Sequence, residues 1–205
     1  QAVAAMSLAM QSSCEVSGAA HIPGEATYLR LEGIAPSVAY RRDALAKLLG
    51  KPVQILAAKS SAAKWRSIGN CAGLADNQER NVWRLSVTPS DAPAIVATLS
   101  RHLDIRYYFD WAGGLIWLDV PPADDASAAT IRSTLPSGHA TLIRAPQYVR
   151  ASTQVFQPQA AALAALEDEA HVERTREMVR EGLEFLGNAF RELGLGYVPS
   201  AANFV

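Results

Sequence analysis

The chain has 205 residues, of which 49% are hydrophobic, and a formal net charge of −1. This length fits one folded domain, or one domain with an appendage, and this composition excludes an intrinsically disordered protein. The near-zero charge gives no general basis for nucleic-acid binding, and no uncharged apolar run approaches the roughly 20 residues of a membrane span.

The N-terminal stretch is short and mildly apolar. Residues 2–14 predict a helix of small residues, and the absence of a basic region argues against a signal peptide. Cys14 and Cys71 have no metal-ligand spacing around them. They predict two free thiols in a reducing compartment, with a disulfide as the alternative.

Short strands and helices are expected to alternate between residues 15 and 80, because apolar residues recur there at periods of 2 and 3.6. Ser37 is a candidate N-cap for the first helix, and Arg41 is expected on that helix's solvent side. The expected elements are a loop at 15–23, a strand at 26–31, a helix at 37–49, a strand at 52–57, a helix at 60–68 and a loop at 71–80.

The next stretch is richer in strand patterns. A hairpin lies among strands that are otherwise linked by helices, and this order predicts an α+β fold with a largely antiparallel sheet and helices on one face. The expected elements are strands at 82–87, 106–111, 115–120 and 139–144, and helices at 91–101 and 126–135.

The stretch DWAGGLIWL, residues 110–118, is the centre of this region. Two β-type runs flank Gly113 and Gly114, and glycine enters the positive-φ conformations of a tight hairpin turn without steric cost. If the neighbouring strands pair in one sheet, polar and aromatic side chains should converge there. These side chains belong to Trp83, Arg84, Asp110, Trp111, Trp117 and His139.

The character of the chain changes after Pro158. Residues 159–193 predict one long amphipathic helix, and residues 197–205 predict a strand. The density of charged residues also rises at this point. We therefore expect two parts, residues 1–158 and residues 159–205.

Five stretches of the first part match one known family together, although each alone is weak: EVSGAAHIP, YLRLEG, WRLSV, YYFDWAGGLIWL and GHATLIRAP. The set resembles the C-terminal domain of the FAD-binding subunit of bacterial glycolate oxidase, one of the FAD-linked oxidases. The resemblance implies a substrate-side domain that covers the flavin, with FAD held mainly by another domain. It also implies a larger FAD-linked subunit and an iron-sulfur subunit as partners. The expected location is the cytoplasm, with association with the inner membrane through those subunits as the other possibility.

The same resemblance assigns roles to the converging residues. Arg84 would hold the carboxylate of a small 2-hydroxy acid, and His139 would take the hydroxyl proton as hydride moves to FAD. The alternatives are an Arg84 paired with Asp110 or solvent, a structural His139, an Asp110 that caps the turn, and tryptophans that belong to the core. No metal site is expected. The remaining candidates that would face substrate or cofactor are Trp83, Asp110, Trp111 and Gly138.

Residues 160–205 carry a second resemblance, through ALAALEDEAHVERTREMVREGLEFL and GLGYVPSAANFV. They resemble a small-domain segment of histidinol-phosphate aminotransferase, a pyridoxal-phosphate enzyme. That family's cofactor lysine, pyridine-pairing aspartate and carboxylate-binding arginine do not fall in this segment. No lysine follows Lys64.

Three functions remain open at this point. The first is an FAD-dependent glycolate oxidase domain, which we expect to be inactive by itself. The second is a non-catalytic interaction module of the glycolate oxidase complex, and the third is a truncated aminotransferase. The organisation is a natural fusion, a fragment or an artificial composite.

Overall fold

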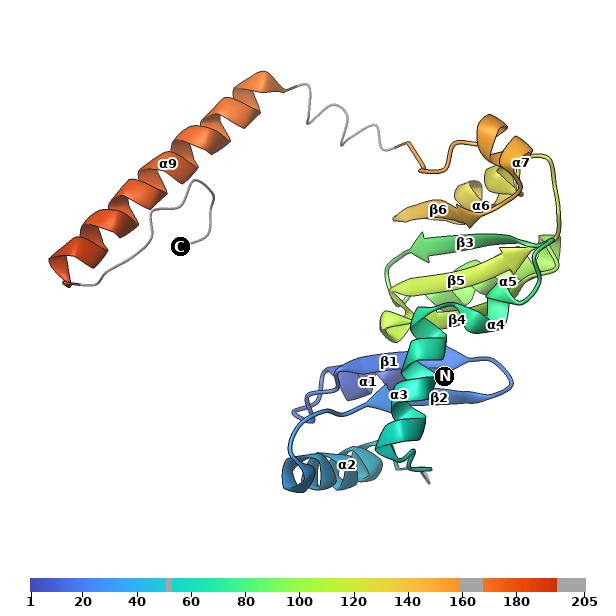
Figure 1. Ribbon diagram of the computed structural model, residues 1–205, viewed down its shortest axis with the longest axis horizontal. Helices are drawn as coiled ribbons and strands as arrows, with labels where there is room; N and C mark the ends of the chain where they lie inside the picture. Colours follow the sequence, from blue (N-terminus) through green and yellow to red (C-terminus); the bar gives the residue numbers. More distant parts are fainter. Residues whose placement is uncertain (51–52, 159–167, 195–205) are drawn as a thin grey trace. The chain divides into compact units, whose positions relative to one another are not determined.

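The computed structural model describes residues 1–50, 53–158 and 168–194, and it divides the chain into two compact units, residues 1–157 and 158–205 (Figure 1). The first unit is built on one six-stranded antiparallel sheet, which confirms the expected α+β class. The sheet order is β2-β1-β4-β5-β3-β6. The strands are β1 (Gly18–Ile22), β2 (Ala26–Arg30), β3 (Asn81–Ser86), β4 (Arg106–Asp110), β5 (Leu115–Val120) and β6 (His139–Arg144).

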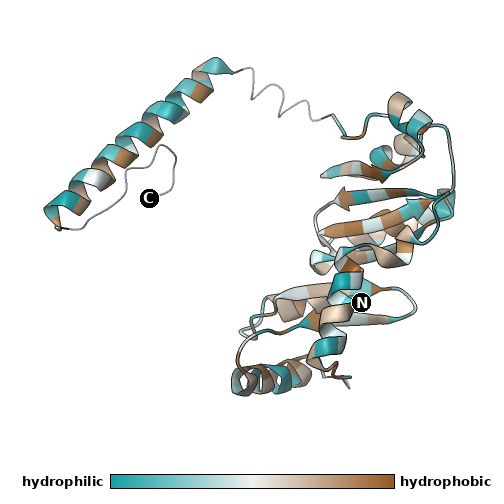
Figure 2. Ribbon diagram, in the orientation of Figure 1, coloured by the Kyte–Doolittle hydropathy of each residue, from teal (hydrophilic) through white to brown (hydrophobic). Residues whose placement is uncertain are grey.

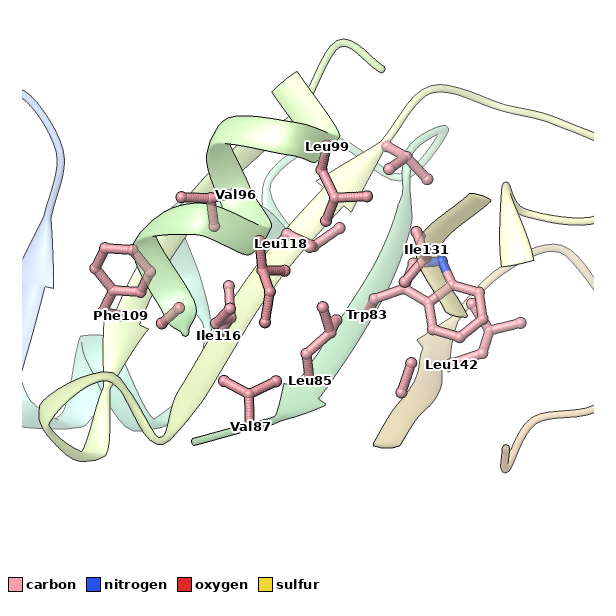
Figure 3. Packing of buried hydrophobic residues seen from close by; sticks show 14 of the residues in the cluster. Trp83, Leu85, Val87, Val96, Leu99, Phe109, Ile116, Leu118, Ile131 and Leu142 are labelled. Atoms are coloured by element: carbon pink, nitrogen blue, oxygen red, sulfur yellow. The ribbon is translucent and has the colours of Figure 1, made fainter. Parts of the chain in front are cut away.

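One face of the sheet carries the main hydrophobic core (Figure 3). Trp83 and Leu85 of β3 point into it, as do Ile116 and Leu118 of β5. The indole of Trp83 is fully buried and donates a hydrogen bond to the carbonyl of Ala126 at 2.9 Å. The helices that complete this core are α1 (Ala2–Met10), α5 (Ala92–His102), α6 (Ala128–Thr134) and α7 (Gln147–Ser152).

A smaller core lies on the opposite face. Ile68 of α3 (Ala58–Gly69) and Leu74 of α4 (Ala72–Ala75) pack with Val82 and Tyr108, and Trp117 lies against this cluster. Helices therefore cover parts of both faces, whereas the sequence pattern predicted them on one. The reason is that the central strands carry apolar side chains on both faces of the sheet, so elements must pack on both faces to bury them.

Helix α2 (Ala35–Leu49) begins two residues before Ser37, so the predicted cap at Ser37 is wrong. The predicted exposure of Arg41 is wrong too, because this residue is only 8% exposed. Its guanidinium donates to the carbonyl of Glu32 at 2.6 Å and to Glu15 Oε2 at 3.1 Å. A buried guanidinium is tolerated when acceptors satisfy its donors, and here it ties two loops to the helix.

Two short stretches differ from the sequence-based expectation. Residues 18–22, predicted as loop, form β1 in the interior of the sheet, paired with β2 and β4. Residues 53–57, predicted as strand together with residue 52, form no regular element, and residue 52 lies outside the described residues. A stretch becomes a strand when it pairs with distant strands, as residues 18–22 do and residues 53–57 do not, and no local pattern encodes such pairing.

Near the end of the first unit, helix α7 (Gln147–Ser152) follows β6. The chain then returns beside β6. Leu142 donates its backbone N–H to the carbonyl of Val155 at 2.9 Å, and Thr141 forms a β-bridge with Phe156. This return brings Phe156 to the edge of the sheet.

The second unit contains the helix α9 (Glu169–Glu192), with apolar and polar positions that alternate along it (Figure 2). The Asp168 carboxylate caps it by accepting from the backbone N–H of His171 at 2.8 Å. The expected amphipathic helix is confirmed over this range, and the residues expected to extend it at 159–167, like the strand expected at 197–205, lie outside the described part.

Candidate functional site

One row of side chains runs across the sheet on the face opposite the main core. In an antiparallel sheet, directly opposed residues on neighbouring strands point to the same face. Four successive pairings of opposed residues therefore align the five side chains of this row on the same face. Its members, in spatial order, are Phe156, Thr141, Arg84, Trp117 and Tyr108.

The two ends of this row differ in their exposure to solvent. Tyr108 lies beneath α3 and donates its hydroxyl hydrogen to the carbonyl of Ile68 at 2.7 Å, and burial raises the pKa of this phenol. At the other end, Phe156 is 74% exposed, and Thr141 and Arg84 are half-buried. The exposed end and its neighbours form what we call the open face, made of Arg84, Ser86, Trp111, His139, Thr141 and Phe156.

Arg84 lies on the ring of Trp111, with 5.6 Å between the guanidinium carbon and the ring centroid. Within the described ranges it has no hydrogen bond or ion pair. A guanidinium stacked on an indole is held in position by the cation–π contact while its in-plane N–H donors stay available. The alternative pairing with Asp110 is not found.

Asp110 instead holds the turn. Its carboxylate accepts from the backbone N–H of Trp111 at 2.8 Å at the start of the 3₁₀ turn η1 (Trp111–Gly113). Positive φ angles occur at Trp111 (50°) and Ala112 (55°), as well as at Gly113 (101°). The predicted hairpin is present, but two residues without glycine's freedom also adopt left-handed conformations. No sequence signal marks them, because that conformation is unfavourable for any residue with a Cβ.

His139 shares the face with Arg84. His139 is opposed to Ser86, and Thr141 is opposed to Arg84, so Arg84 and His139 are diagonal neighbours. Diagonal Cβ atoms in such a ladder are about 7–8 Å apart. The structure therefore brings Arg84, Trp111 and His139 together. Their roles in binding remain a proposal.

Two other candidates have different positions. Trp83 precedes Arg84 in the strand, so alternation sends it to the opposite face, into the main core. The structure thus does not bring Trp83 to the open face. Gly138, with φ of 90°, directly precedes β6 and lies beside the backbone of Ser86. Phe156 and Thr141 were not identified from the sequence, because the bridge between them follows an irregular return with no strand pattern.

The pKa of Asp110 allows a pH test of the turn. Burial raises this pKa above its ordinary value of 3.8, so the folded state favours the protonated acid. The stability that Asp110 contributes is then fully present below the unfolded pKa and is lost as pH rises through the folded pKa. Asp110→Asn keeps an acceptor for Trp111 but has no charge to bury. The variant should therefore gain stability relative to the parent as pH rises from about 3 to about 7, checked by urea unfolding at each pH. A constant difference across this range would contradict the expectation.

Neither a membrane span nor a metal centre is found in the described residues. No helix in residues 1–50, 53–158 and 168–194 has the length and apolar character needed to cross a bilayer. Over the same ranges, no three histidine, cysteine or acidic side chains gather in a way that would hold a metal ion. Cys14 and Cys71 are both buried free thiols.

Comparisons with known proteins give one consistent name. No family model matches the chain, and no solved structure matches it. A histidinol-phosphate aminotransferase of Symbiobacterium thermophilum is 67% identical over 46 residues, which is 22% of this chain and 13% of that protein. The protein of that name from Moorella thermoacetica is 43% identical over 70 residues, 31% of this chain and 18% of its own length. The one from Akkermansia muciniphila is 57% identical over 47 residues, which is 23% of this chain and 13% of that protein. The chain thus spans 13–18% of the length of these curated relatives.

These findings correct the functional prediction. The relatives are named aminotransferases, and nothing supports the resemblance to a glycolate oxidase domain. An FAD-dependent 2-hydroxy-acid oxidoreductase, FAD as its cofactor and the glycolate oxidase subunits as partners were therefore wrong predictions. Membrane association was expected only through those subunits, so it is no longer supported. The similarity to histidinol-phosphate aminotransferase, expected for residues 160–205, is supported.

Proposed function

We propose that the C-terminal unit is an aminotransferase segment, and that it contributes packing rather than catalytic groups to such an enzyme. The observation that carries the proposal is the 67% identity over 46 residues. Residues 160–205 also number 46, so the match has the length of the segment in which the resemblance was found. In a complete enzyme, the activity that this assigns is amino transfer involving histidinol phosphate.

The residues present do not fit a pyridoxal-phosphate site. Attachment of that cofactor in this enzyme class needs a lysine, and the four lysines of the chain are Lys47, Lys51, Lys59 and Lys64. All four precede the segment, and the nearest of them, Lys64, lies 96 residues before residue 160. Lys64 is, moreover, paired with Glu25 at 2.5 Å. We therefore assign no chemical step to the residues of this chain.

Helix α9 has the character of a packing element. Val179, Leu183 and Leu186 are half-buried along one side, while the ion pairs Glu173–Arg176 (3.6 Å) and Glu177–Arg180 (3.7 Å) lie on exposed positions. Exposed pairs of this kind stabilise a helix only slightly, so most of its stability must come from its apolar side. An amphipathic helix of this kind is typical of the surface layer of a larger domain.

A transplant tests the proposal. The matched 46 residues of the Symbiobacterium enzyme would be replaced by residues 160–205 of this chain. We expect the chimera to keep its transaminase activity and a similar Tm, since largely conserved packing surfaces tolerate volume-conserving exchange at less than about 1.5 kcal/mol. Activity and thermal unfolding of chimera and parent would be measured side by side.

A second chimera serves as the control. Leu183→Asp within the transplanted segment would place a carboxylate on the apolar side of α9, at a cost of about 3 kcal/mol or more if that side is buried in the enzyme. Glu184→Gln, one residue along on an exposed position, should be neutral. An unfolded or inactive first chimera, or a harmless Leu183→Asp, would refute the packing role.

A further inference from the structure

We propose that the open face of the first unit binds a small aromatic carboxylate, with the carboxylate on Arg84 and the ring over Thr141 against Phe156. This goes beyond the proposed function, because it concerns the other unit and uses none of the aminotransferase residues. Three observations carry it: the available donors of Arg84, the exposed ring of Phe156, and the distance between them.

The guanidinium is the anchor for the acid group. Arg84 is half-buried, lies on Trp111, and within the described residues makes no ion pair. The carboxylate of Asp110, which precedes Trp111 in the chain, accepts from the backbone N–H of Trp111. A planar guanidinium with available donors binds a carboxylate in two-pronged fashion, and such charge-assisted bonds are among the stronger ones in proteins.

Phe156 supplies the aromatic contact. The ring is 74% exposed, yet its backbone is fixed on both sides. The carbonyl of Val155 accepts from the N–H of Leu142 at 2.9 Å, and the side chain of Gln157 accepts from the N–H of Ala140 at 2.9 Å. An exposed aromatic ring on a segment held by hydrogen bonds on both sides loses little conformational entropy when a second ring stacks on it.

The distance between the two groups selects the ligand. Arg84 of β3, Thr141 of β6 and Phe156, which bridges to Thr141, are successive members of one row. Neighbouring strands lie about 4.8 Å apart, so the backbones of Arg84 and Phe156 are separated by about 10 Å. The guanidinium of Arg84 lies on Trp111 of the β4–β5 turn, which is on the side of β3 away from β6. The ligand must therefore bridge the gap from there to Phe156, and a carboxylate joined to one ring through a single carbon supplies that length. The hydroxyls of Ser86 and Thr141 and the imidazole of His139 give the surroundings a polar rim.

The probe is phenylacetate, titrated into the full chain and followed by NMR chemical-shift changes of the tryptophan indole N–H groups. We expect saturable binding that perturbs Trp111, and acetate should bind at least about tenfold more weakly because it lacks the ring. Arg84→Gln should weaken phenylacetate binding by at least about tenfold. Phe156→Ala should weaken it by about fivefold, the value of one aromatic pair.

Two further variants separate binding from folding. Arg84→Lys keeps the charge but not the planar fork, and should still weaken binding by several-fold while leaving the circular dichroism spectrum unchanged. Arg101→Gln, an exposed arginine on α5, should leave binding as in the parent. The proposal is overturned if phenylacetate does not saturate, if acetate binds equally well, or if Arg84→Gln and Arg101→Gln behave alike.

Discussion

Gly138→Ala should destabilise the first unit by about 3 kcal/mol or more. Gly138 has φ of 90°, a region that costs a residue with a Cβ about 1–2 kcal/mol. An added Cβ would also overlap the carbonyl oxygen of Ser86, far inside van der Waals contact. That oxygen belongs to the backbone of β3, so it cannot rotate away, and overpacking of this kind costs about 1–3 kcal/mol. The two costs act together because neither can be relieved without moving β6.

The measurement is urea unfolding of the full chain, followed by tryptophan fluorescence. Gly73→Ala is the matched control, because nothing lies within 4 Å of the added Cβ and Gly73 lies in helix α4. This control should be neutral, or stabilising by up to about 1 kcal/mol. A loss below about 1 kcal/mol for Gly138→Ala, or equal effects of the two variants, would show that the start of β6 is not fixed by this contact.

Gly138 therefore affects the open face indirectly, because it helps to fix where β6 lies beside β3. It leads directly into β6 beside the end of β3, where the register opposes His139 to Ser86 and Thr141 to Arg84. The sequence suggested Gly138 as a residue that faces a ligand. Its structural role is to allow a close approach of two backbones, from which the positions of His139 and Thr141 follow.

The local parts of this site were predictable from sequence, and the long-range parts were not. Gly113 and Gly114 between two β-type runs predicted a hairpin, and β4 and β5 do pair across it. The sequence could not place β3 between β5 and β6, because strand order depends on pairings between residues far apart in the chain. That order is what puts Arg84 and His139 on one face.

The burial of polar side chains also could not be predicted from local sequence patterns. Arg41 fits the exposed side of an amphipathic helix by its spacing, yet it is buried, because carbonyl groups of two distant loops accept its hydrogen bonds. Residues 18–22 contain glycine and small side chains typical of a loop. Their small size suits a strand in the interior of the sheet instead, where the ring of Trp65 approaches Gly18 closely.

Asp119 should be the most costly acidic residue to replace in the first unit. Its side chain is fully buried at the end of β5, where Oδ1 accepts from Arg80 Nε at 2.7 Å and Oδ2 accepts from Arg106 Nε at 3.0 Å. These two arginines also reach outward, Arg80 to Asp104 at 2.9 Å and Arg106 to Asp76 at 3.0 Å. The network joins the start of β3, the start of β4 and the end of β5.

Asp119→Asn keeps the volume of the side chain but removes the charge between two guanidinium groups. Loss of one partner from a buried ion pair typically costs about 3–5 kcal/mol. The Arg106 side chain is 40% exposed and can be partly rehydrated, so we expect the lower end, about 3 kcal/mol. The measurement is the free energy of unfolding in urea at pH 7, at low and at high salt.

Asp104→Asn is the matched control, because it removes the same chemical group from the same Arg80. The Asp104 side chain is 77% exposed, against 0% for Asp119. Exposed pairs contribute about 0–1 kcal/mol and are screened by salt, whereas buried pairs are screened much less. The cost of Asp119→Asn should therefore persist at 1 M salt, where the Debye length is about 3 Å, while the cost of Asp104→Asn should vanish. If both costs fall together with salt, the carboxylate of Asp119 is accessible to water, and the three strand ends are held by packing rather than by this charge.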